Sequence, residues 1–373
     1  MSEIPTQSLV VVTDEPSQAI NALALKLNAP IVDWNIDRPE ASAAEAHAAL
    51  ESARSVIVSC GRHHSKSLKL LASFARKRGL VSVLQANRDT PGSDKFGIVL
   101  ETIQAVRIGP MPFDKRHDNG PFDIIGDVHG CAYELMELLH RLGHVADGWE
   151  ATPSSIWHAW IQAHRTGRRV ILLGDITDRG PMNLAALRIA RAIERVGGYL
   201  VAGNHDDKLA RWMQGRPVSI GKGLEVTVRE LEVLPKDDLL VLSKWLSSRP
   251  RHLVLDGGQL VVAHAGLAEH LQDRATPEAI AFATYGKPSA DAATTSEGYP
   301  EREDWALDYK GQPVVVHGHV VHSEPREINR VHAIDTGCVF GGKLTAFRWP
   351  EKTYEQVEAK MTYYHPRTGS QMR

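Results

Sequence analysis

The chain has 373 residues, of which 43% are hydrophobic and 24% are charged. This composition excludes a wholly disordered, collagenous or disulfide-stapled chain. The 43 basic and 45 acidic residues leave a formal charge of -2, which argues against non-specific coating of nucleic acid. The three cysteines form no CxxC pair, so we expect a reduced, cytoplasmic protein. No segment has the roughly 20 apolar residues that a membrane helix needs.

The first third of the chain alternates apolar runs with helical segments. We predict strands over 8–13, 31–32, 55–60 and 80–86, and helices over 16–27, 41–53 and 62–78. This alternation is typical of a small parallel α/β domain. Residues 109–121 are rich in proline, glycine and charge, so we place a domain boundary there. The expected organisation is a domain over 1–110, a second over 111–363 and a flexible tail over 364–373.

The second domain is predicted to hold apolar strands that end in glycine and polar residues. We predict strands within 122–130, 168–175, 199–206, 313–319, 331–337 and 343–349, and a hairpin over 251–266 that turns at 256–258. Helices are predicted over 132–142, 182–196 and 236–247. Because each strand is almost entirely apolar, we expect it to be buried in a rigid sheet. Polar residues at the ends of rigid strands are what a preorganised site needs.

The polar residues at these strand ends offer oxygen and nitrogen donors without a thiolate. They are Asp127, His129, Asp175, Asp178, Arg179, Asn204, His205, His264, His317 and His319. Such donors suit Mn²⁺, Fe or Zn²⁺ rather than a structural zinc held by cysteines. Two divalent ions with two carboxylates and one hydroxide retain a net positive charge, which attracts phosphate. His317 alternates with His319 along its strand, so we expect the two side chains on opposite faces.

Five short motifs occur in a fixed order along the chain. They are GDVHG (126–130), GDITDRG (174–180), GNHD (203–206), HAG (264–266) and GH (318–319). In this order they resemble the calcineurin-like metallophosphoesterases of the phosphoprotein-phosphatase branch. The resemblance implies an α/β fold class in which a β-sandwich is flanked by helices.

Longer segments are similar to the phosphatase of bacterial polynucleotide kinase-phosphatase, over about residues 110–350. The segments are GPFDIIGDVHGC, GNHDDKLARWMQGR, LVVAHAGL, WALDYKGQPVVVHGH and AIDTGCVFGGKLTAFRWPEK. A kinase of that kind carries a phosphate-binding loop, but the turn after SLVVV reads TDEPSQA, without glycine or a Lys-Ser/Thr pair. Such a turn cannot cradle phosphates, so 1–110 is interpreted as a degenerate kinase-like domain. Val320 stands where many relatives have threonine.

The resemblance implies a role for each matching residue. Two divalent ions, with Mn²⁺ preferred over Fe, Zn or Ni, would be held by Asp127, His129, Asp175, Asn204, His264 and His319. Asp175 would bridge the two ions. Asp335 would lie near the ions without binding them, as a partner of the metal ligands. Arg179 would bind phosphate, His205 would protonate the leaving oxygen, and Asp178 would orient His205. Asp206 is interpreted as a helix cap, and the buried thiols of Cys60 and Cys131 as inert.

The expected activity is hydrolysis of phosphate esters by metal-hydroxide attack. Phosphate or 2′,3′-cyclic phosphate RNA ends, or nucleotides, are the first substrate hypothesis. The alternatives are a diadenosine tetraphosphate hydrolase, a protein Ser/Thr phosphatase, or a non-catalytic nucleotide- or RNA-binding adaptor. Specificity is assigned to 144–167, 207–235 and 284–308. The helix over 62–78 groups five cations on one face, either a solvated face or a nucleic-acid contact: Arg62, Lys66, Lys69, Arg76 and Lys77.

Overall fold

The computed structural model divides the chain into two compact units. It describes residues 2–12, 17–34, 38–52, 54–60, 65–86, 93–100, 106–147, 149–150, 152–158, 160–289, 302–365 and 370–371. The first unit comprises Met1–Asp114 and Asp273–Ile280, and the second comprises Lys115–Gln272 and Ala281–Arg373. No pattern in the sequence predicts that segment 273–280 belongs to the first unit, because only contacts in three dimensions assign it there.

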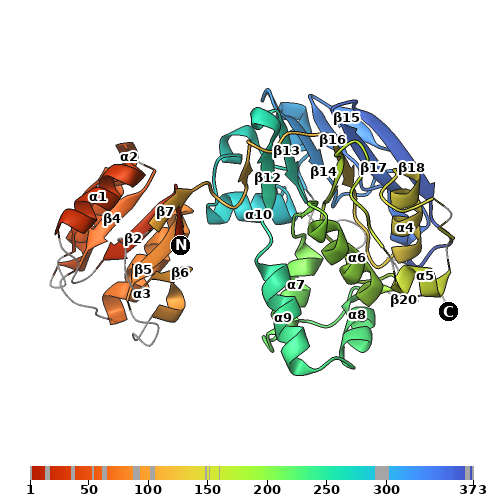
Figure 1. Ribbon diagram of the computed structural model, residues 1–373, viewed down its shortest axis with the longest axis horizontal. Helices are drawn as coiled ribbons and strands as arrows, with labels where there is room; N and C mark the ends of the chain where they lie inside the picture. The colour runs from red at the N-terminus through yellow and green to blue at the C-terminus, as the bar shows by residue number, and fades with distance from the viewer. Residues whose placement is uncertain are drawn as a thin grey trace. The chain divides into compact units, whose positions relative to one another are not determined.

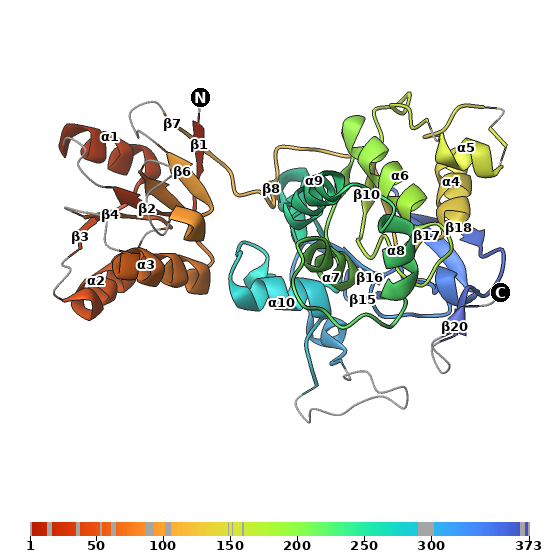
Figure 2. The same ribbon diagram turned by 90° about the horizontal axis from the view of Figure 1, so that it is seen from below.

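A five-stranded parallel sheet forms the centre of the first unit, with strand order β3-β4-β2-β5-β6 (Figure 1). Its strands are β2 (Ser8–Val12), β3 (Ile31–Asp33), β4 (Val56–Ser59), β5 (Val81–Gln85) and β6 (Ile98–Leu100). Helix α1 (Ser17–Leu27) covers one face, and α2 (Pro39–Ser52) and α3 (Ser65–Arg78) cover the other (Figure 2). A 3₁₀ turn, η1 (Ser93–Lys95), precedes β6, and a separate parallel pair joins β1 (Ser2–Pro5) to β7 (Val106–Gly109).

Strand β2 is apolar from Leu9 to Val12 because both of its faces are buried. Leu9 and Val11 pack in the core beneath α2 and α3, and Val10 and Val12 pack in the core beneath α1. On helix α3, the side chain of Leu70 is 42% exposed, whereas Leu68 and Leu71 are buried. The predicted cations at 66, 69, 76 and 77 are exposed. Residues 13–16, which begin the TDEPSQA turn, and residues 61–64, which include Arg62, lie outside the described residues.

Two mixed sheets form a sandwich in the second unit, which confirms the expected fold class. Their orders are β11-β10-β9-β17-β18 and β15-β16-β14-β13-β12-β8. The strands are β8 (Asp114–Lys115), β9 (Phe122–Ile125), β10 (Arg169–Leu172), β11 (Tyr199–Leu200), β12 (His252–Leu255), β13 (Leu260–Ala263), β14 (Val314–His317), β15 (Arg326–Ile328), β16 (Val331–Ala333), β17 (Lys343–Trp349) and β18 (Thr353–Glu358). A further short pair is β19 (Tyr364–His365) with β20 (Ser370–Gln371).

Helices pack on the outer face of the five-stranded sheet (Figure 1). The helices of this unit are α4 (Ala132–Arg141), α5 (Pro153–Trp157), α6 (Asn183–Arg195), α7 (Asn204–Met213), α8 (Leu224–Leu231) and α9 (Lys236–Ser247). Helix α10 (Pro277–Tyr285) and the 3₁₀ turns η2 (Asp256–Gly258), η3 (Glu269–Leu271), η4 (Trp305–Asp308) and η5 (Cys338–Phe340) complete the elements. Between the sheets, a continuous apolar core includes Phe122, Ile171, Leu253, Val316 and Phe347.

Two sequence expectations in this unit differ from the structure. The strand expected over 199–206 ends at Leu200, and Asn204 already begins α7. The expected tail begins at 364, yet Tyr364 is buried in the core and pairs with Gln371. The fold therefore continues past 363. Within the described residues, no helix combines the length and apolar character needed to cross a bilayer.

Candidate metal centre

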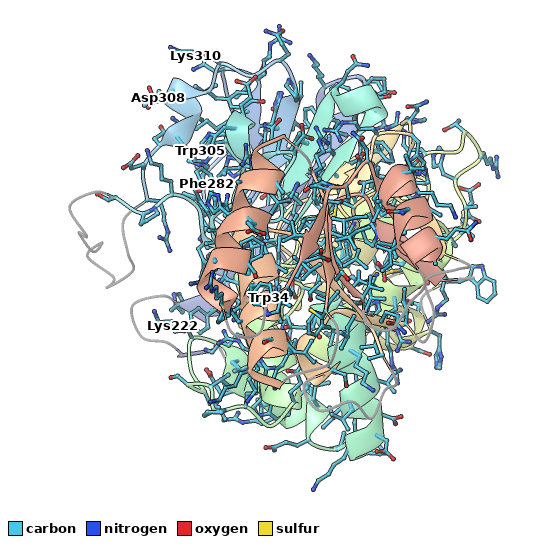
Figure 3. The ribbon with its side chains drawn as sticks, turned by 90° about the vertical axis from the view of Figure 1, so that its left-hand side faces the viewer. Trp34, Lys222, Phe282, Trp305, Asp308 and Lys310 are labelled. Carbon is cyan, nitrogen blue, oxygen red and sulfur yellow. The ribbon has the colours of Figure 1, made fainter. Side chains whose placement is uncertain are left out.

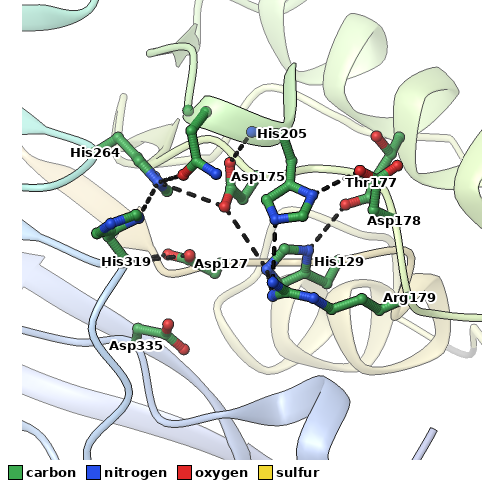
Figure 4. Close-up of polar contacts among 12 residues, drawn as sticks. Asp127, His129, Asp175, Thr177, Asp178, Arg179, His205, His264, His319 and Asp335 are labelled. Atoms are coloured by element: carbon green, nitrogen blue, oxygen red, sulfur yellow. Dashed lines mark hydrogen bonds and ion pairs between the residues drawn. The ribbon is translucent and has the colours of Figure 1, made fainter. Parts of the chain in front are cut away.

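The predicted site residues follow the ends of six strands from both sheets. Strands β9, β10 and β11 are parallel, and so are β13, β14 and β16. Parallel strands end at the same edge of a sheet, where ligand sites form. The loops after these strands bring together the side chains in Figure 4: Asp127, His129, Asp175, Asp178, Arg179, Asn204, His205, His264, His319 and Asp335.

Asp175 lies at the middle of this cluster. Its Oδ2 is 3.7 Å from Nε2 of His129 and 3.4 Å from Nε2 of His264. Its Oδ1 accepts a hydrogen bond of 2.9 Å from the backbone N–H of His205. Two sets of potential metal ligands therefore share this carboxylate, one with His129 and His205 and one with His264 and His319. A carboxylate shared in this way is suited to bridge two cations.

The donors around His264 fit a divalent cation. Nδ1 of His264 donates to the carbonyl oxygen of Leu173 at 2.9 Å, so Nε2 is an acceptor. That nitrogen lies 3.1 Å from Oδ1 of Asn204 and 3.1 Å from Nδ1 of His319, besides Asp175. Several lone pairs thus point toward one another. Nε2 of His264 carries no proton, so it cannot donate a hydrogen bond to the oxygens of Asn204 and Asp175. A cation bound by oxygen and nitrogen donors satisfies this arrangement.

Glycines are required where two loops pass the acidic ligands. A Cβ on Gly318 would lie 1.9 Å from Oδ1 of Asp127. A Cβ on Gly203 would lie 2.2 Å from Oδ1 of Asp175. The backbone N–H of His319, beside Gly318, donates to Asp127 at 3.2 Å. The glycines in the GH and GNHD motifs therefore let the backbone approach the carboxylates closely.

Backbone strain is concentrated at the site. Non-glycine residues with positive φ include His129 (43°), Asp175 (46°), Asp178 (79°), Arg179 (72°) and His319 (68°). Left-handed backbone costs a non-glycine residue about 1–3 kcal/mol and clusters at functional sites. The contacts of the surrounding loops therefore hold these five residues in a backbone conformation that is unfavourable by itself.

A histidine–carboxylate pair lies beside the shared aspartate. Nδ1 of His205 donates to Oδ2 of Asp178 at 2.6 Å, and Oγ1 of Thr227 donates to Oδ1 of Asp178 at 2.6 Å. Arg179 donates to Nε2 of His205 at 3.1 Å and to Nε2 of His129 at 2.7 Å. The guanidinium thus joins the two histidines (Figure 4). No sequence pattern indicated Thr227, although it lies in the flagged segment 207–235.

Two aromatic rings position Arg179. Its guanidinium carbon lies 5.3 Å from the ring centroid of Phe340 and 5.8 Å from that of Tyr364. Cation–π contacts of this kind restrain a guanidinium while leaving its N–H groups available. Tyr364 was expected in the tail, so no pattern in the sequence predicted its contact with Arg179.

Burial controls the protonation of the candidate ligands. It lowers the pKa of His129 and His264 well below the ordinary value, and that of His319 to about 3. These imidazoles are neutral, which is the form that binds metal. Burial also raises the pKa of Asp127, with the Asp335 carboxylate adding to the effect, and the pKa of Asp175. The charge of Arg179 opposes this rise at both carboxylates without cancelling it, and a divalent ion would supply further positive charge.

The remaining candidates differ in position. Asp206 accepts from the backbone N–H of Gly203 at 2.9 Å, which supports the cap interpretation, and also from Asp175 N at 2.8 Å. Asp335 accepts from the backbone N–H of Gly337 at 3.0 Å, and its charge contributes to raising the pKa of Asp127. His317 lies away from the cluster and contacts the Trp305 ring at a centroid distance of 5.7 Å.

The sequence model of the calcineurin-like phosphoesterases matches residues 120–323. The chain belongs to the calcineurin-like phosphoesterase family. Like other members, it is a metal-dependent phosphoester hydrolase.

Relatives within this family are similar over most of their own length. A bis(5′-nucleosyl)-tetraphosphatase PrpE (asymmetrical) of Geobacillus sp. strain WCH70 is 40% identical over 246 residues, covering 65% of this chain and 95% of the relative. The protein of the same name from Bacillus subtilis strain 168 is 38% identical over 247 residues, covering 65% and 96%. A metallophosphoesterase structure from Sphaerobacter thermophilus aligns with 65% of this chain and 90% of its own, at 15% identity and a TM-score of 0.36. The two PrpE relatives carry the tetraphosphatase name, and neither is named as a polynucleotide kinase-phosphatase.

Proposed function

We propose that this protein hydrolyses bis(5′-nucleosyl) tetraphosphates asymmetrically, to a nucleoside monophosphate and a nucleoside triphosphate. The support is the name shared by relatives 40% and 38% identical, which this chain covers over 95% and 96% of their length. The cluster around Asp175 supports phosphoester hydrolysis in general, and the relatives supply the substrate class. The RNA-end hypothesis therefore gives way to the tetraphosphatase alternative.

The proposed cofactor is a pair of divalent cations, with Mn²⁺ preferred and Fe, Zn or Ni as alternatives. The residues that would hold them are Asp127, His129, Asp175, Asn204, His264 and His319. Such ions, when bound, lower the pKa of water and stabilise charge on phosphoryl oxygens. The neutral imidazoles and the buried carboxylates, whose pKa values stay raised despite the charge of Arg179, support this assignment.

The other side chains are proposed to handle the phosphate and the proton. Arg179 carries donors that match the oxygens of a phosphate. His205 would deliver a proton to the oxygen that leaves. Asp178 would stabilise the imidazolium form of His205 through their 2.6 Å contact. Thr227 would keep Asp178 in place by its hydrogen bond.

Product analysis tests the function. Purified protein loaded with Mn²⁺ is incubated with diadenosine tetraphosphate, and the nucleotides are separated by anion-exchange chromatography. We expect AMP and ATP in equal amounts, while two ADP would contradict the asymmetrical assignment. A 2′,3′-cyclic nucleotide, a phosphorylated RNA end and a phosphoserine peptide are assayed in parallel. A kcat/KM for any of these above that for the tetraphosphate would overturn the substrate assignment.

For the first unit, we propose a kinase-like docking module without phosphoryl transfer. Its parallel sheet with helices on both faces supports the α/β class. The exposed cations of α3, such as Lys66 and Lys69, are the proposed contact for a phosphate backbone. Fluorescence anisotropy with a labelled RNA tests this proposal. Charge reversal of Lys66 and Lys69 should weaken RNA binding, and an unchanged affinity would identify a solvated face.

A further inference from the structure

Three buried side chains form a second cluster of potential ligands in the second unit. They are Cys131, Glu134 and Cys338, whose two sulfurs and one carboxylate oxygen all lie within 4.8 Å of one another. The cluster shares no residue with the two ligand sets that meet at Asp175. Each of its three residues is at most 2% exposed. The roles proposed so far make no use of these groups.

Two segments far apart in the sequence bring the sulfurs together. Cys131 is the residue before helix α4, directly after the GDVHG motif, and Glu134 lies in the first turn of that helix. Cys338 begins η5, and the residue before it, Gly337, turns the chain with a φ of 70°. The two thiols are in hydrogen-bond contact with each other. The start of α4 and the start of η5 thus present two sulfurs and a carboxylate to one point of the core.

The two carboxylate oxygens of Glu134 differ in their contacts. Oε1 accepts from the backbone N–H of Lys360 at 2.9 Å and from the hydroxyl of Tyr363 at 2.8 Å. These two bonds hold the carboxylate in one orientation. In the described part of the structure, Oε2 is buried and has no hydrogen-bond partner. A buried polar atom without a partner is unfavourable, and an ion that binds it removes the penalty.

A buried atom without a partner does not identify an ion site by itself. Nε1 of Trp34, in the first unit, is another such atom among the described residues (Figure 3). An indole N–H is a donor and cannot bind a cation. Oε2 of Glu134 is an acceptor, and its carboxylate lies within 4.8 Å of two sulfurs. The combination of an unpaired acceptor with two thiols therefore points to a metal ion.

Two thiolates and one carboxylate form a donor set for Zn²⁺. Thiolates select Zn²⁺ over Mg²⁺, Ca²⁺ or Mn²⁺. Two sulfurs bound to one tetrahedral Zn²⁺ at about 2.3 Å lie about 3.8 Å apart, which the 4.8 Å spread of the cluster allows. Binding releases two thiol protons to solvent, so one doubly charged ion replaces two protons and the net charge of the core is unchanged. The ion also replaces the weak bond of 3.8 Å from Sγ of Cys131 to the carbonyl oxygen of His129.

We propose that Cys131, Glu134 and Cys338 bind one structural Zn²⁺ ion, separate from the cations proposed for the metal centre. A water molecule takes the fourth position of the tetrahedral ion. The ion joins the start of α4 to η5. Phe340, the last residue of η5, packs on the guanidinium of Arg179 at 5.3 Å. The ion thus stabilises a turn that supports the site without touching a substrate.

Cobalt substitution tests the site, because Co²⁺ bound by thiolate absorbs strongly in the near ultraviolet. The full chain is produced in medium with Co²⁺ as the added transition metal, and its absorption spectrum is recorded. We expect a thiolate-to-cobalt charge-transfer band in the wild type. Asp175→Asn should keep this band, because the residues proposed for the metal centre include no sulfur. The band therefore reports on the cluster whether or not the metal centre is loaded.

Substitutions in the cluster assign the ligands. Cys338→Ser should abolish the band, whereas Cys60→Ser, at the buried thiol of the first unit, should leave it unchanged. Glu134→Gln should keep the band, since both thiolates remain, but should speed the loss of Co²⁺ to a chelator about tenfold. Glu137→Gln is the matched control, because Glu137 lies on the same helix and is partly exposed.

Several outcomes would overturn the proposal. A wild type without the band would show that the thiols bind no metal, and a Cys131–Cys338 disulfide found by mass spectrometry would show that the sulfurs bind each other instead. A band that persists in Cys338→Ser would place the ion elsewhere. Equal rates of Co²⁺ loss from Glu134→Gln and the wild type would remove Glu134 from the site. Thermal unfolding identifies any variant that has not folded, and the wild-type spectrum then carries the test.

Discussion

Nδ1 of His205 lies 2.6 Å from Oδ2 of Asp178, and both side chains are buried. Burial raises the pKa of Asp178 to about 6 and lowers that of His205. Both shifts disfavour the charged forms, an Asp178 carboxylate and a His205 imidazolium, when no ligand is bound. Nε2 of His205 accepts from Arg179, the proposed phosphate ligand. The pair therefore connects a proton carrier to the place where a phosphate would bind.

Loss of the proton carrier should depend on the leaving group. We expect His205→Ala to reduce kcat about 10²-fold to 10⁴-fold for phenyl esters with leaving groups of high pKa. Nitrophenyl esters should lose less, because their leaving oxygen needs little protonation. The measurement is kcat across a series of substituted phenyl phosphates. Equal losses across the series would rule out the general-acid role of His205.

Replacing the shared carboxylate should affect both cations. Asp175→Asn keeps the size of the side chain but removes the charge between His129 and His264. We expect bound Mn²⁺ to fall below one ion per chain by elemental analysis, with kcat reduced about 10³-fold. Glu327→Gln, a change at the exposed residue of β15, is the control. Retention of two ions by Asp175→Asn would contradict a bridging position.

A methyl group at Gly318 should displace a ligand without a change in charge. Its Cβ would lie 1.9 Å from Oδ1 of Asp127, so the loop or the carboxylate has to move. We expect Gly318→Ala to weaken metal binding about 10-fold to 100-fold. Gly221→Ala is matched to it, because a Cβ there meets nothing within 4 Å. Titration with Mn²⁺ compares the two, and equal affinities would refute the close-approach argument.

Metal affinity should rise with pH. The pKa values of Asp127 and Asp175 are raised, so each carboxylate tends to hold a proton that metal binding must displace. The lowered pKa of His319, about 3, means that this ring contributes no proton above pH 5. The Kd for Mn²⁺ should fall by up to about tenfold per pH unit for each proton displaced. Calorimetry in buffers of different ionisation enthalpy counts the protons, and none released would contradict the prediction.

The thiols should be unreactive in the folded protein. All three cysteines are buried and free, and burial raises the pKa of Cys60 to about 12. Burial also raises the pKa of Cys131, which lies beside Cys338. Because the thiolate is the reactive form, iodoacetamide at pH 8 should label less than about 0.1 thiol per chain. Labelling should become complete in denaturant, and rapid native labelling at Cys131 would show that this part of the core opens.

Local patterns in the sequence were sufficient for several elements. The predicted helix over 236–247 and strand over 343–349 have the same bounds as α9 and β17. Their apolar residues repeat with the period of the element, which needs no distant partner. The strand predicted over 199–206 was wrong in its second half, because Gly203 and Asp206 cap a helix there. The N–H of Gly203 donates to the Asp206 side chain, and this capping contact starts the helix although the apolar residues before it favour a strand.

The sequence by itself determined the kinds of ligand, their order and their position after apolar strands, because glycine-flanked motifs are local. Only the tertiary structure decided that Asp175 lies between His129 and His264, which are 135 positions apart by their numbers. It also decided that Tyr364 lies over Arg179 and that Trp305 and Arg302 line one cavity together with Val320, the residue after His319. Those relationships depend on how the two sheets pack, and packing joins residues whose separation along the chain carries no periodic signal.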